Sequence, residues 1–399
     1  MPHAFLNILS SGLRAGTRAG WSLFVPLVLS VPSYGIYSLF QATVASVTQI
    51  AILGTPHTIL RQPTRELPLL GLFLHSLSLA VIGLLLFGFI VRQHGWLFYA
   101  LVSAASITMI LYLVLIARTK SRLQFGHVLR SEAMGSAVFV LAILSISVIL
   151  RTKGPGSAQF PVMAGVEILA AGMVVVSLLS GTVGRLSPRE RSIEGTRRDL
   201  SSVYSVGVVV LFDVILFQRL EVFFLERSPD GMEGVAAFGL AAQLMNVFLL
   251  VPFAVGETWA PRFARSFGTG PAEFLQTVKQ KLHVYRRLYV VLVIGSVCAT
   301  PLLVQGVFRK YAEWTWPITA LVAIRILCSY IGFYSATLYA SRRERFLYAP
   351  VIAGAVIALI ANFLFTLRWG MSGAILAYGL TQLSVVAGMI VVIRRLRLP

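Results

Sequence analysis

The sequence predicts an all-α polytopic membrane protein, with about 12 transmembrane helices in two six-helix lobes around a central cavity. Hydrophobic residues make up 57% of the chain and the mean hydropathy is +0.82, which leaves too little polar surface for a soluble protein of 399 residues. Apolar runs follow one another along the whole chain. Lys and Arg gather in the short connections between these runs, as they do beside transmembrane helices.

Each predicted span is an apolar run of about 20 residues, the length of helix that crosses the hydrocarbon core. The spans lie near residues 13–32, 36–58, 68–91, 96–117, 133–150, 161–180, 203–224, 235–257, 288–307, 316–340, 347–367 and 371–393. The first has the weakest pattern, because a full-length helix there includes Arg14 or Arg18. We interpret it as a transmembrane helix and not as a cleavable signal, since Pro26 and Pro32 lead directly into the second span.

The positions of the 34 Lys and Arg residues predict the topology. Most of them fall near the two termini and in the even-numbered connections between the predicted spans. Because cytoplasmic loops are enriched in Lys and Arg, both termini are expected in the cytoplasm.

The longest strongly charged connection, GTVGRLSPRERSIEGTRRDLSS, divides the predicted spans into two groups of six. We therefore expect an N-terminal lobe at 1–185, a cytoplasmic linker at 186–202 and a C-terminal lobe at 203–399. A second basic connection, 270–287, carries apolar residues on one helical face. It is either a helix on the membrane surface or a cytoplasmic extension of the ninth span.

Motifs for catalysis are absent from the sequence. No HExxH, paired CxxC, Walker loop or GxSxG occurs, so we expect no enzyme activity, no cofactor and no metal. The net charge of +19 lies in the clusters that set topology, and no nucleic-acid partner is expected. Cys298 and Cys328 lie inside apolar runs, which gives no indication of a disulfide framework.

Polar residues inside the predicted spans are the candidate functional residues, because a charged group in hydrocarbon costs about 2.5–3.5 kcal/mol on insertion scales. Polar stripes on the second and eighth spans and a small-residue face on the tenth predict a lining for the cavity. The candidates for substrate binding are Arg325, Arg219, Gln41, Thr48, Gln243, Asn246 and Ser329. The candidates for ion coupling are Asp213 and Glu167.

A structural role is the alternative for each of these residues. Amide side chains can bond across packed helices, and Asp213 with Arg325 can form a buried ion pair. Arg219 and Glu221 lie near the predicted outer boundary, where long side chains reach water. Their charge is therefore less informative.

Three segments resemble Wzx-type polysaccharide transporters, the flippases of lipid-linked oligosaccharides within the multidrug/oligosaccharidyl-lipid/polysaccharide exporter superfamily. YGIYSLFQATVASVTQIAILGTPHTILR at 34–61 is similar to the family's FGxYxL…LGLPxALLR pattern. AAFGLAAQLMNVFLLVPFAVGETWAPRFAR at 236–265 is similar to its VGxYxxAxxL…P…PxxA helix. ANFLFTLRWGMSGAILAYGLTQLSVV at 361–386 resembles its N-x-x-L…GxxGAAxA ending.

The resemblance implies a multi-pass protein of the bacterial cytoplasmic (inner) membrane that works by alternating access. Its substrate would be an undecaprenyl-diphosphate-linked oligosaccharide, an O-antigen or exopolysaccharide repeat unit. The implied partners are that lipid-linked sugar, membrane lipids, a coupling proton or sodium ion, and polysaccharide polymerase machinery. Arginine forks suit a diphosphate in a low-dielectric cavity, and aromatic side chains suit sugars.

Two other functions compete with the flippase. A cation-coupled multidrug exporter of the same superfamily would use Asp213 or Glu167 to exchange a proton for a cationic substrate. A membrane glycosyltransferase or polymerase also has many spans, but the longest external connection here, around 151–160, is short for such an enzyme. The charge that faces the cavity distinguishes the first two: arginines favour an anionic lipid diphosphate and carboxylates favour a cation.

The topology predicts the labelling of introduced cysteines. Cysteines that replace Ser192 and Arg343 should be shielded from an impermeant thiol reagent in intact cells, and one that replaces Gly156 should be labelled. Labelling at position 192 without lysis would overturn the predicted topology.

Overall fold

A computed structural model of the protein describes residues 2–56, 59, 68–122, 124–153, 159–182, 187, 190, 200, 203–204, 207, 220–340 and 343–396. The regular structure of these residues is helical, and they include no strand. The chain divides into two compact units, Met1–Ile215 and Leu216–Pro399. Most of the predicted linker 186–202 lies outside the described residues, so the lobe boundaries stay predictions.

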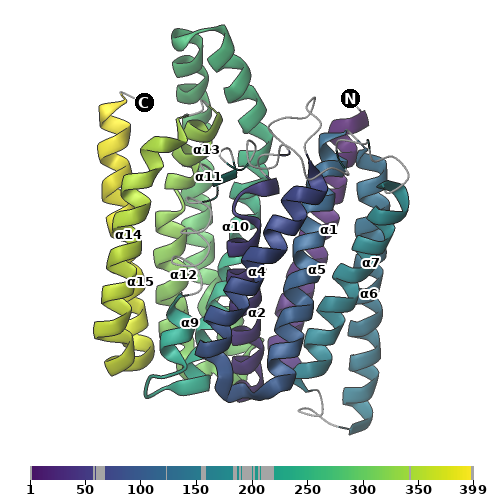
Figure 1. The fold of residues 1–399 in the computed structure, drawn as a ribbon. Helices are drawn as coiled ribbons and strands as arrows, with labels where there is room; N and C mark the ends of the chain where they lie inside the picture. Colours follow the sequence, from purple (N-terminus) through teal and green to yellow (C-terminus); the bar gives the residue numbers. More distant parts are fainter. Residues whose placement is uncertain are drawn as a thin grey trace. The chain divides into compact units, whose positions relative to one another are not determined.

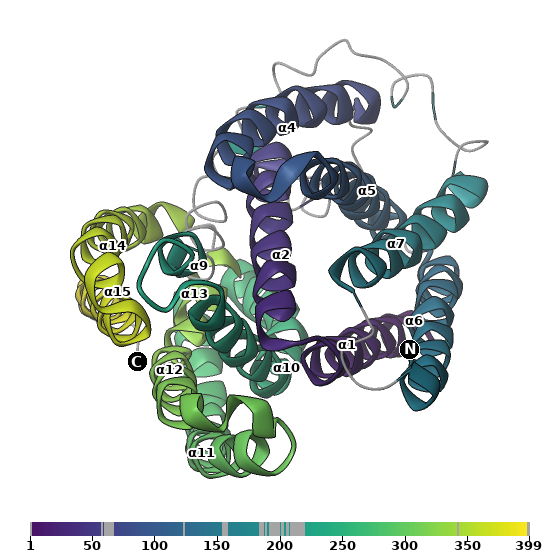
Figure 2. The ribbon, with the colours of Figure 1, turned by 90° about the horizontal axis from the view of Figure 1, so that it is seen from below.

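Unit 1 consists of long helices that overlap the first six predicted spans, although the first and fifth begin 11 and 8 positions before the predicted starts at 13 and 133. They are α1 (Pro2–Val28), α2 (Val31–Ile52), α4 (Leu69–Val91), α5 (Gly95–Ser121), α6 (Phe125–Lys153) and α7 (Phe160–Thr182). Helix α1 packs on α6, α6 packs on α7, and α5 packs on α7. Helix α2 packs on α4 and α5, so the six helices form one bundle (Figure 2).

The boundary between the first two helices differs from the prediction. Helix α2 begins at Val31, five positions before the predicted start at 36. Ser30 caps it, because the Ser33 backbone N–H donates to the Ser30 hydroxyl at 3.4 Å, and Pro32 occupies the first turn. A Ser followed closely by Pro is a helix-start signal, which outweighed the apolar pattern used for the prediction.

Unit 2 is also helical, but two of its predicted spans are interrupted. Its elements are α9 (Leu220–Leu225), α10 (Gly231–Thr269), α11 (Pro271–Gly306), α12 (Thr315–Cys328), α13 (Ile331–Ala340), α14 (Tyr348–Ala361), a π-helical turn (Asn362–Thr366) and α15 (Leu367–Arg395). The tenth predicted span is thus two helices separated at Ser329 and Tyr330. Helices α14 and α15 lie side by side (Figure 1).

Helices α10 and α11 form a hairpin that extends past the ends of the other helices in unit 2 (Figure 1). Residues 271–287 belong to α11 without a break. The segment is therefore an extension of the ninth span, and the alternative of a separate surface helix is wrong. Its apolar residues Phe274, Val278 and Leu282 are buried, and α11 packs on α10. The apolar face therefore stabilises the hairpin instead of contacting lipid.

The helices have the surface expected of membrane spans. Within the described residues, nine helical segments are long and apolar enough to cross a membrane; one of them, Arg345–Arg395, covers both the eleventh and the twelfth predicted spans. Trp96, Trp316 and Trp369 are 81%, 76% and 55% exposed and lie near the starts of α5, α12 and α15. Exposed tryptophans at helix ends are typical of a membrane–water interface. The protein is a multi-pass membrane protein.

Gly370 gives the start of α15 a conformation that other residues rarely adopt. Its φ and ψ are 54° and −130°. The next backbone N–H, of Met371, donates to Asp230 Oδ2 at 2.6 Å, and a Cβ on Gly370 would lie 2.1 Å from that oxygen. Asp230 precedes α10, so this contact fastens α15 to the start of α10.

Replacing Gly370 with alanine should destabilise unit 2 by about 2–4 kcal/mol, from the positive φ and the loss of the Asp230 hydrogen bond. Gly379→Ala is the matched control, because a Cβ there would meet only Ile324 Cδ1 at 3.6 Å, which is ordinary contact. Thermal unfolding in detergent measures both. Equal unfolding temperatures for the two variants would show that the Gly370 conformation carries no strain.

Candidate functional site

Glu167 is the centre of a hydrogen-bond cluster in unit 1. It lies on α7 and is partly buried. Its Oε1 accepts hydrogen bonds from Trp21 Nε1 at 3.2 Å, from Gln41 Nε2 at 2.9 Å and from the Tyr37 hydroxyl. The Tyr37 oxygen in turn accepts from Trp21 Nε1 at 3.1 Å and from Gln41 Nε2 at 3.0 Å. Three helices, α1, α2 and α7, therefore meet on one carboxylate.

The local sequence explains why these helices can approach one another. Ala164 and Ala170 flank Glu167 on α7 and are buried, so small side chains leave room beside the carboxylate. Trp21 and Tyr37 are 1% and 0% exposed, so their rings fill the core while their polar atoms reach Glu167. Glu167 and Gln41 were predicted from the sequence. Trp21 and Tyr37 were not, because an aromatic residue in a span usually indicates packing.

All three donors to Glu167 are neutral. Within the described part of the chain Glu167 makes no ion pair, so the structural alternative of a buried salt bridge does not apply to it there. A carboxylate held by neutral groups can gain a proton or bind a cation without breaking an ion pair. This is the chemistry expected of an ion-coupling residue.

A second polar cluster in unit 1 joins α1 to α5 and α6. The Tyr112 hydroxyl donates to Glu132 Oε1 at 2.7 Å and accepts from Arg14 Nη1 at 3.2 Å. Arg14 and Glu132 are 4.0 Å apart, and the Arg18 guanidinium lies 5.2 Å from the centre of the Tyr112 ring. Arg14 and Arg18 are thus held inside the first helix by specific partners. Glu132 was missed because it lies just before the predicted fifth span.

The other predicted substrate residues of unit 1 and unit 2 lie in different surroundings. Thr48 is buried, and its hydroxyl has no hydrogen-bond partner among the described residues. In unit 2, Gln243 is buried and Asn246, one turn further along α10, is exposed. Arg325 lies in the last turn of α12 and is partly exposed. The Ser329 hydroxyl donates to the Ile326 carbonyl at 2.7 Å, so it closes the end of α12.

Asp213 and Arg219 lie outside the described residues. Their roles, and the ion pair of Asp213 with Arg325, stay predictions. Glu221, which follows them, is described and is fully buried; neither of its carboxylate oxygens has a hydrogen-bond partner among the described residues. The expectation that Glu221 reaches water is therefore wrong, and this side chain is a further buried carboxyl group of unit 2.

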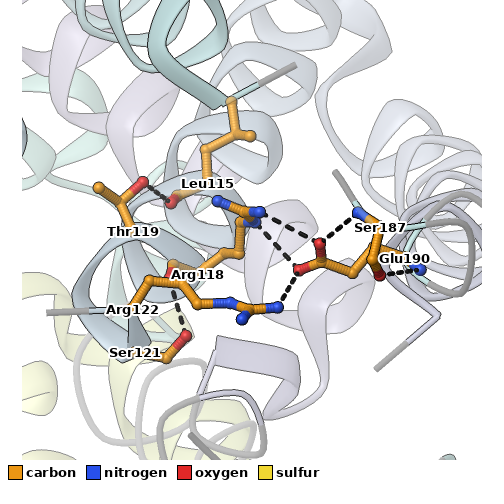
Figure 3. Close-up of polar contacts among 7 residues, drawn as sticks. All are labelled: Leu115, Arg118, Thr119, Ser121, Arg122, Ser187 and Glu190. Atoms are coloured by element: carbon orange, nitrogen blue, oxygen red, sulfur yellow. Dashed lines mark hydrogen bonds and ion pairs between the residues drawn. The ribbon is translucent and has the colours of Figure 1, made fainter. Parts of the chain in front are cut away.

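Glu190 joins the segment after α7 to the ends of α4 and α5 in unit 1. Its Oε1 and Oε2 accept from Nε and Nη2 of Arg118 at 3.1 Å each, and its Oε1 accepts from Arg122 Nη2 at 3.3 Å (Figure 3). The Glu190 carbonyl accepts from the Leu70 backbone N–H at 3.1 Å. The Arg118 and Glu190 side chains are only 3% and 4% exposed. This ion pair is therefore buried.

The sequence contains a signal for the Glu190 contact. Ser187 and Glu190 have the S-x-x-E spacing of a capping box, in which each residue bonds the backbone of the other. The Ser187 N–H donates to Glu190 Oε2 at 3.0 Å, and the Glu190 N–H donates to the Ser187 hydroxyl at 3.2 Å. Burial opposes ionisation of Glu190, but Arg118, the Ser187 N–H and Arg122 together outweigh it and lower the pKa of the carboxyl.

Known proteins match the chain in structure and not in sequence. No protein-family model matches it, and no curated protein matches it. The MATE multidrug transporter DinF-BH covers 99% of this chain and 94% of its own at 13% identity, with a TM-score of 0.66. An inward-facing multidrug resistance MATE family transporter of the MOP superfamily covers 98% and 93% at 15% identity, with a TM-score of 0.58. The outward-facing form covers 98% and 93% at 12% identity, with a TM-score of 0.55.

At these identities the likeness shows the fold alone. The chain has the fold of the MATE transporters in the MOP superfamily. This agrees with the helical transporter fold that the sequence resemblance implies. It does not single out the Wzx-type polysaccharide transporters within that superfamily.

The Glu190 ion pairs predict a loss of stability on substitution. Glu190→Gln should lower the free energy of unfolding by about 2–4 kcal/mol, because it leaves the buried Arg118 guanidinium without its counter-charge. Glu273→Gln, at an exposed position of α11, should change it by less than about 0.5 kcal/mol. Thermal unfolding in detergent at neutral pH compares the two variants, and equal effects would contradict the structural role of the ion pair.

The lowered pKa of Glu190 also gives this contribution a pH dependence. The folded-state pKa lies below the unfolded value, so the stabilisation is fully present above the ordinary pKa of 4.5 and is lost as the pH falls through the lowered value. The difference in unfolding temperature between the wild type and Glu190→Gln should therefore narrow below about pH 4.5. A difference that stays constant with pH would contradict the assignment.

Proposed function

We propose that the protein is a secondary transporter that couples substrate movement to a cation through Glu167. The single observation that carries this proposal is a carboxylate within a membrane span that accepts hydrogen bonds from three neutral side chains of two other helices. The likeness to transporters in inward-facing and outward-facing conformations supports an alternating-access cycle.

The cluster gives a physical route from ion binding to helix movement. The ionised Glu167 only accepts hydrogen bonds, whereas the protonated carboxyl must also donate one. Protonation also removes the negative charge that strengthens the hydrogen bonds from Tyr37 and Gln41, both on α2, to Oε1. Protonation therefore changes the contacts that hold α1 and α2 to α7. A cation bound to the carboxylate would act in the same way by competing with the three donors.

The substrate class that we favour is a cation exported in exchange for a proton or sodium ion. Two observations support it over the lipid-linked oligosaccharide. The coupling candidate that the structure describes is a carboxylate without an ion pair, and the similar solved structures are described as multidrug transporters. An interior carboxylate without an ion pair among the described residues suits a cationic substrate.

The flippase of undecaprenyl-diphosphate-linked oligosaccharides is the second candidate. Arg18 supports it, because this exposed guanidinium lies on α1 over the Tyr112 ring, an arrangement that can hold a phosphate. The three motif resemblances support it independently. Arg325 of unit 2 is an arginine that the sequence predicts as a substrate-binding residue of the second unit.

The test of coupling uses purified protein in proteoliposomes with ethidium as the cationic probe. Glu167→Gln should lower gradient-driven ethidium transport at least about tenfold, because an amide cannot exchange a proton or cation, and Glu167→Asp should retain part of it. The control is Glu233→Gln, at an exposed position near the start of α10. Transport is measured with imposed proton and sodium gradients at equal protein content.

If Glu167→Gln transports ethidium as fast as the wild type does, the coupling role is refuted. If the wild type moves no ethidium, the flippase candidate is tested next by surface polysaccharide in cells that produce Arg18→Gln at normal abundance. Loss of polysaccharide in those cells would favour an anionic lipid-linked substrate over a cation. Normal polysaccharide would exclude the anion role of Arg18.

A further inference from the structure

The exposed face of α11 changes from apolar to basic within about one helical turn. Val291, Ile294 and Leu302 are 69%, 60% and 72% exposed, which is the surface of a helix in lipid. Toward the start of the helix, the exposed side chains with charge or titratable groups are Glu273, Lys279, His283, Arg286 and Arg287. Glu273, close to the tip of the hairpin, is the one acidic residue of α11.

The length of α11 places this change at a membrane boundary. Residues 288–306 form about 28 Å of helix, which is close to the thickness of the hydrocarbon core. Arg286 and Arg287 therefore lie where the core ends and the headgroups begin. The topology prediction puts this boundary on the cytoplasmic side.

An aromatic cluster lies at the same level and holds one of the two arginines. The Tyr330 ring centre is 5.7 Å from that of Tyr285 and 5.0 Å from that of Tyr289. The Tyr330 hydroxyl accepts a hydrogen bond from Arg286 Nε at 3.0 Å. Tyrosines are typical of the interface, where the ring lies in lipid and the hydroxyl in the headgroup layer. This contact fixes the guanidinium at the boundary.

The charge of Arg286 is not neutralised by a carboxylate among the described residues. Its partners are the neutral hydroxyls of Tyr330 and Tyr334, and the guanidinium carries further N–H donors for an acceptor outside the protein. Arg287 is the next residue, so the two guanidiniums leave the same turn of the helix. A phosphate at this point would meet two positive charges.

We propose that Arg286 and Arg287, with Tyr330, form a binding site for an anionic phospholipid. The lipid phosphate bonds to the guanidinium groups, and the acyl chains run along the exposed face at Val290, Val291 and Ile294. Both chemistries occur on one continuous face of α11. A soluble anion or an acidic protein would bind the arginines but would leave the apolar face uncovered. A phospholipid covers both, so it is the occupant that fits. The site is independent of the transport proposed for Glu167.

The experiment compares two double variants with equal changes in net charge. Arg286→Gln with Arg287→Gln removes the proposed site. Arg309→Gln with Arg368→Gln removes two exposed arginines from the predicted opposite side of unit 2. Purified full-length protein in detergent is mixed with dioleoyl-phosphatidylglycerol, with dioleoyl-phosphatidylcholine or with soluble glycerol phosphate, and the unfolding temperature is measured.

Phosphatidylglycerol should raise the unfolding temperature of the wild type and of the Arg309/Arg368 variant by about 3 °C or more relative to phosphatidylcholine. The rise should vanish in the Arg286/Arg287 variant and should be smaller in Tyr330→Phe, which loses one hydroxyl. Tyr330→Phe keeps both charges and so remains informative if the double variant does not fold. An equal rise in all variants, or an equal rise with glycerol phosphate, would overturn the lipid site.

Discussion

The hydrogen bonds on Glu167 join helices that are far apart in the sequence. Trp21 lies 146 positions and Gln41 126 positions away from it. In hydrocarbon no water can replace a lost partner, so each donor that faces a carboxylate inside the bundle has few alternatives. The hydrogen bonds that connect α1 and α2 to α7 in this cluster therefore depend on the state of a single side chain. A polar contact that is minor in water becomes an organising contact in a membrane.

Interruptions in the helices are concentrated in unit 2. The α12 helix ends at Cys328 and α13 begins at Ile331, and the π-helical turn at Asn362–Thr366 interrupts the eleventh predicted span. Gly370 interrupts the helix between the eleventh and twelfth predicted spans. Such breaks leave backbone groups that need other partners. The Asp230 carboxylate supplies one of them at Met371. Unit 1 has no comparable break inside its described long helices. Its bundle is therefore built from continuous helices, whereas unit 2 includes interrupted ones.

Most of the helical fold could be predicted from sequence, because hydrophobic length is a strong signal for spans. The predicted span 68–91 is helix α4, Leu69–Val91, with one residue of difference. Boundaries were less predictable where a cap decided them, as at Ser30. The extension of α11 could not be separated from a surface helix, because an amphipathic pattern does not show whether the apolar face meets lipid or another helix.

The candidate site was predicted in part for a similar reason. An intramembrane Glu167 or Gln41 is conspicuous in an apolar run. Tyr37 and Trp21 are not, because most of each side chain is apolar and only the polar atom takes part. Glu190 lies in a charged connection, where its two arginine partners cannot be distinguished from other basic residues by spacing. The contacts between segments distant in the chain therefore could not be predicted from the sequence.

The unbroken course of α11 from the hydrocarbon to the hairpin has a mechanical consequence. About 16 residues separate the tip at Pro271 from Arg287, which makes a rigid arm of about 24 Å. A tilt of about 10° in the membrane-embedded part would displace the tip by about 4 Å, by simple lever geometry. Small rearrangements among closely packed helices are thus magnified outside the bilayer. A spectroscopic label at the tip would report on movements that are difficult to measure inside it.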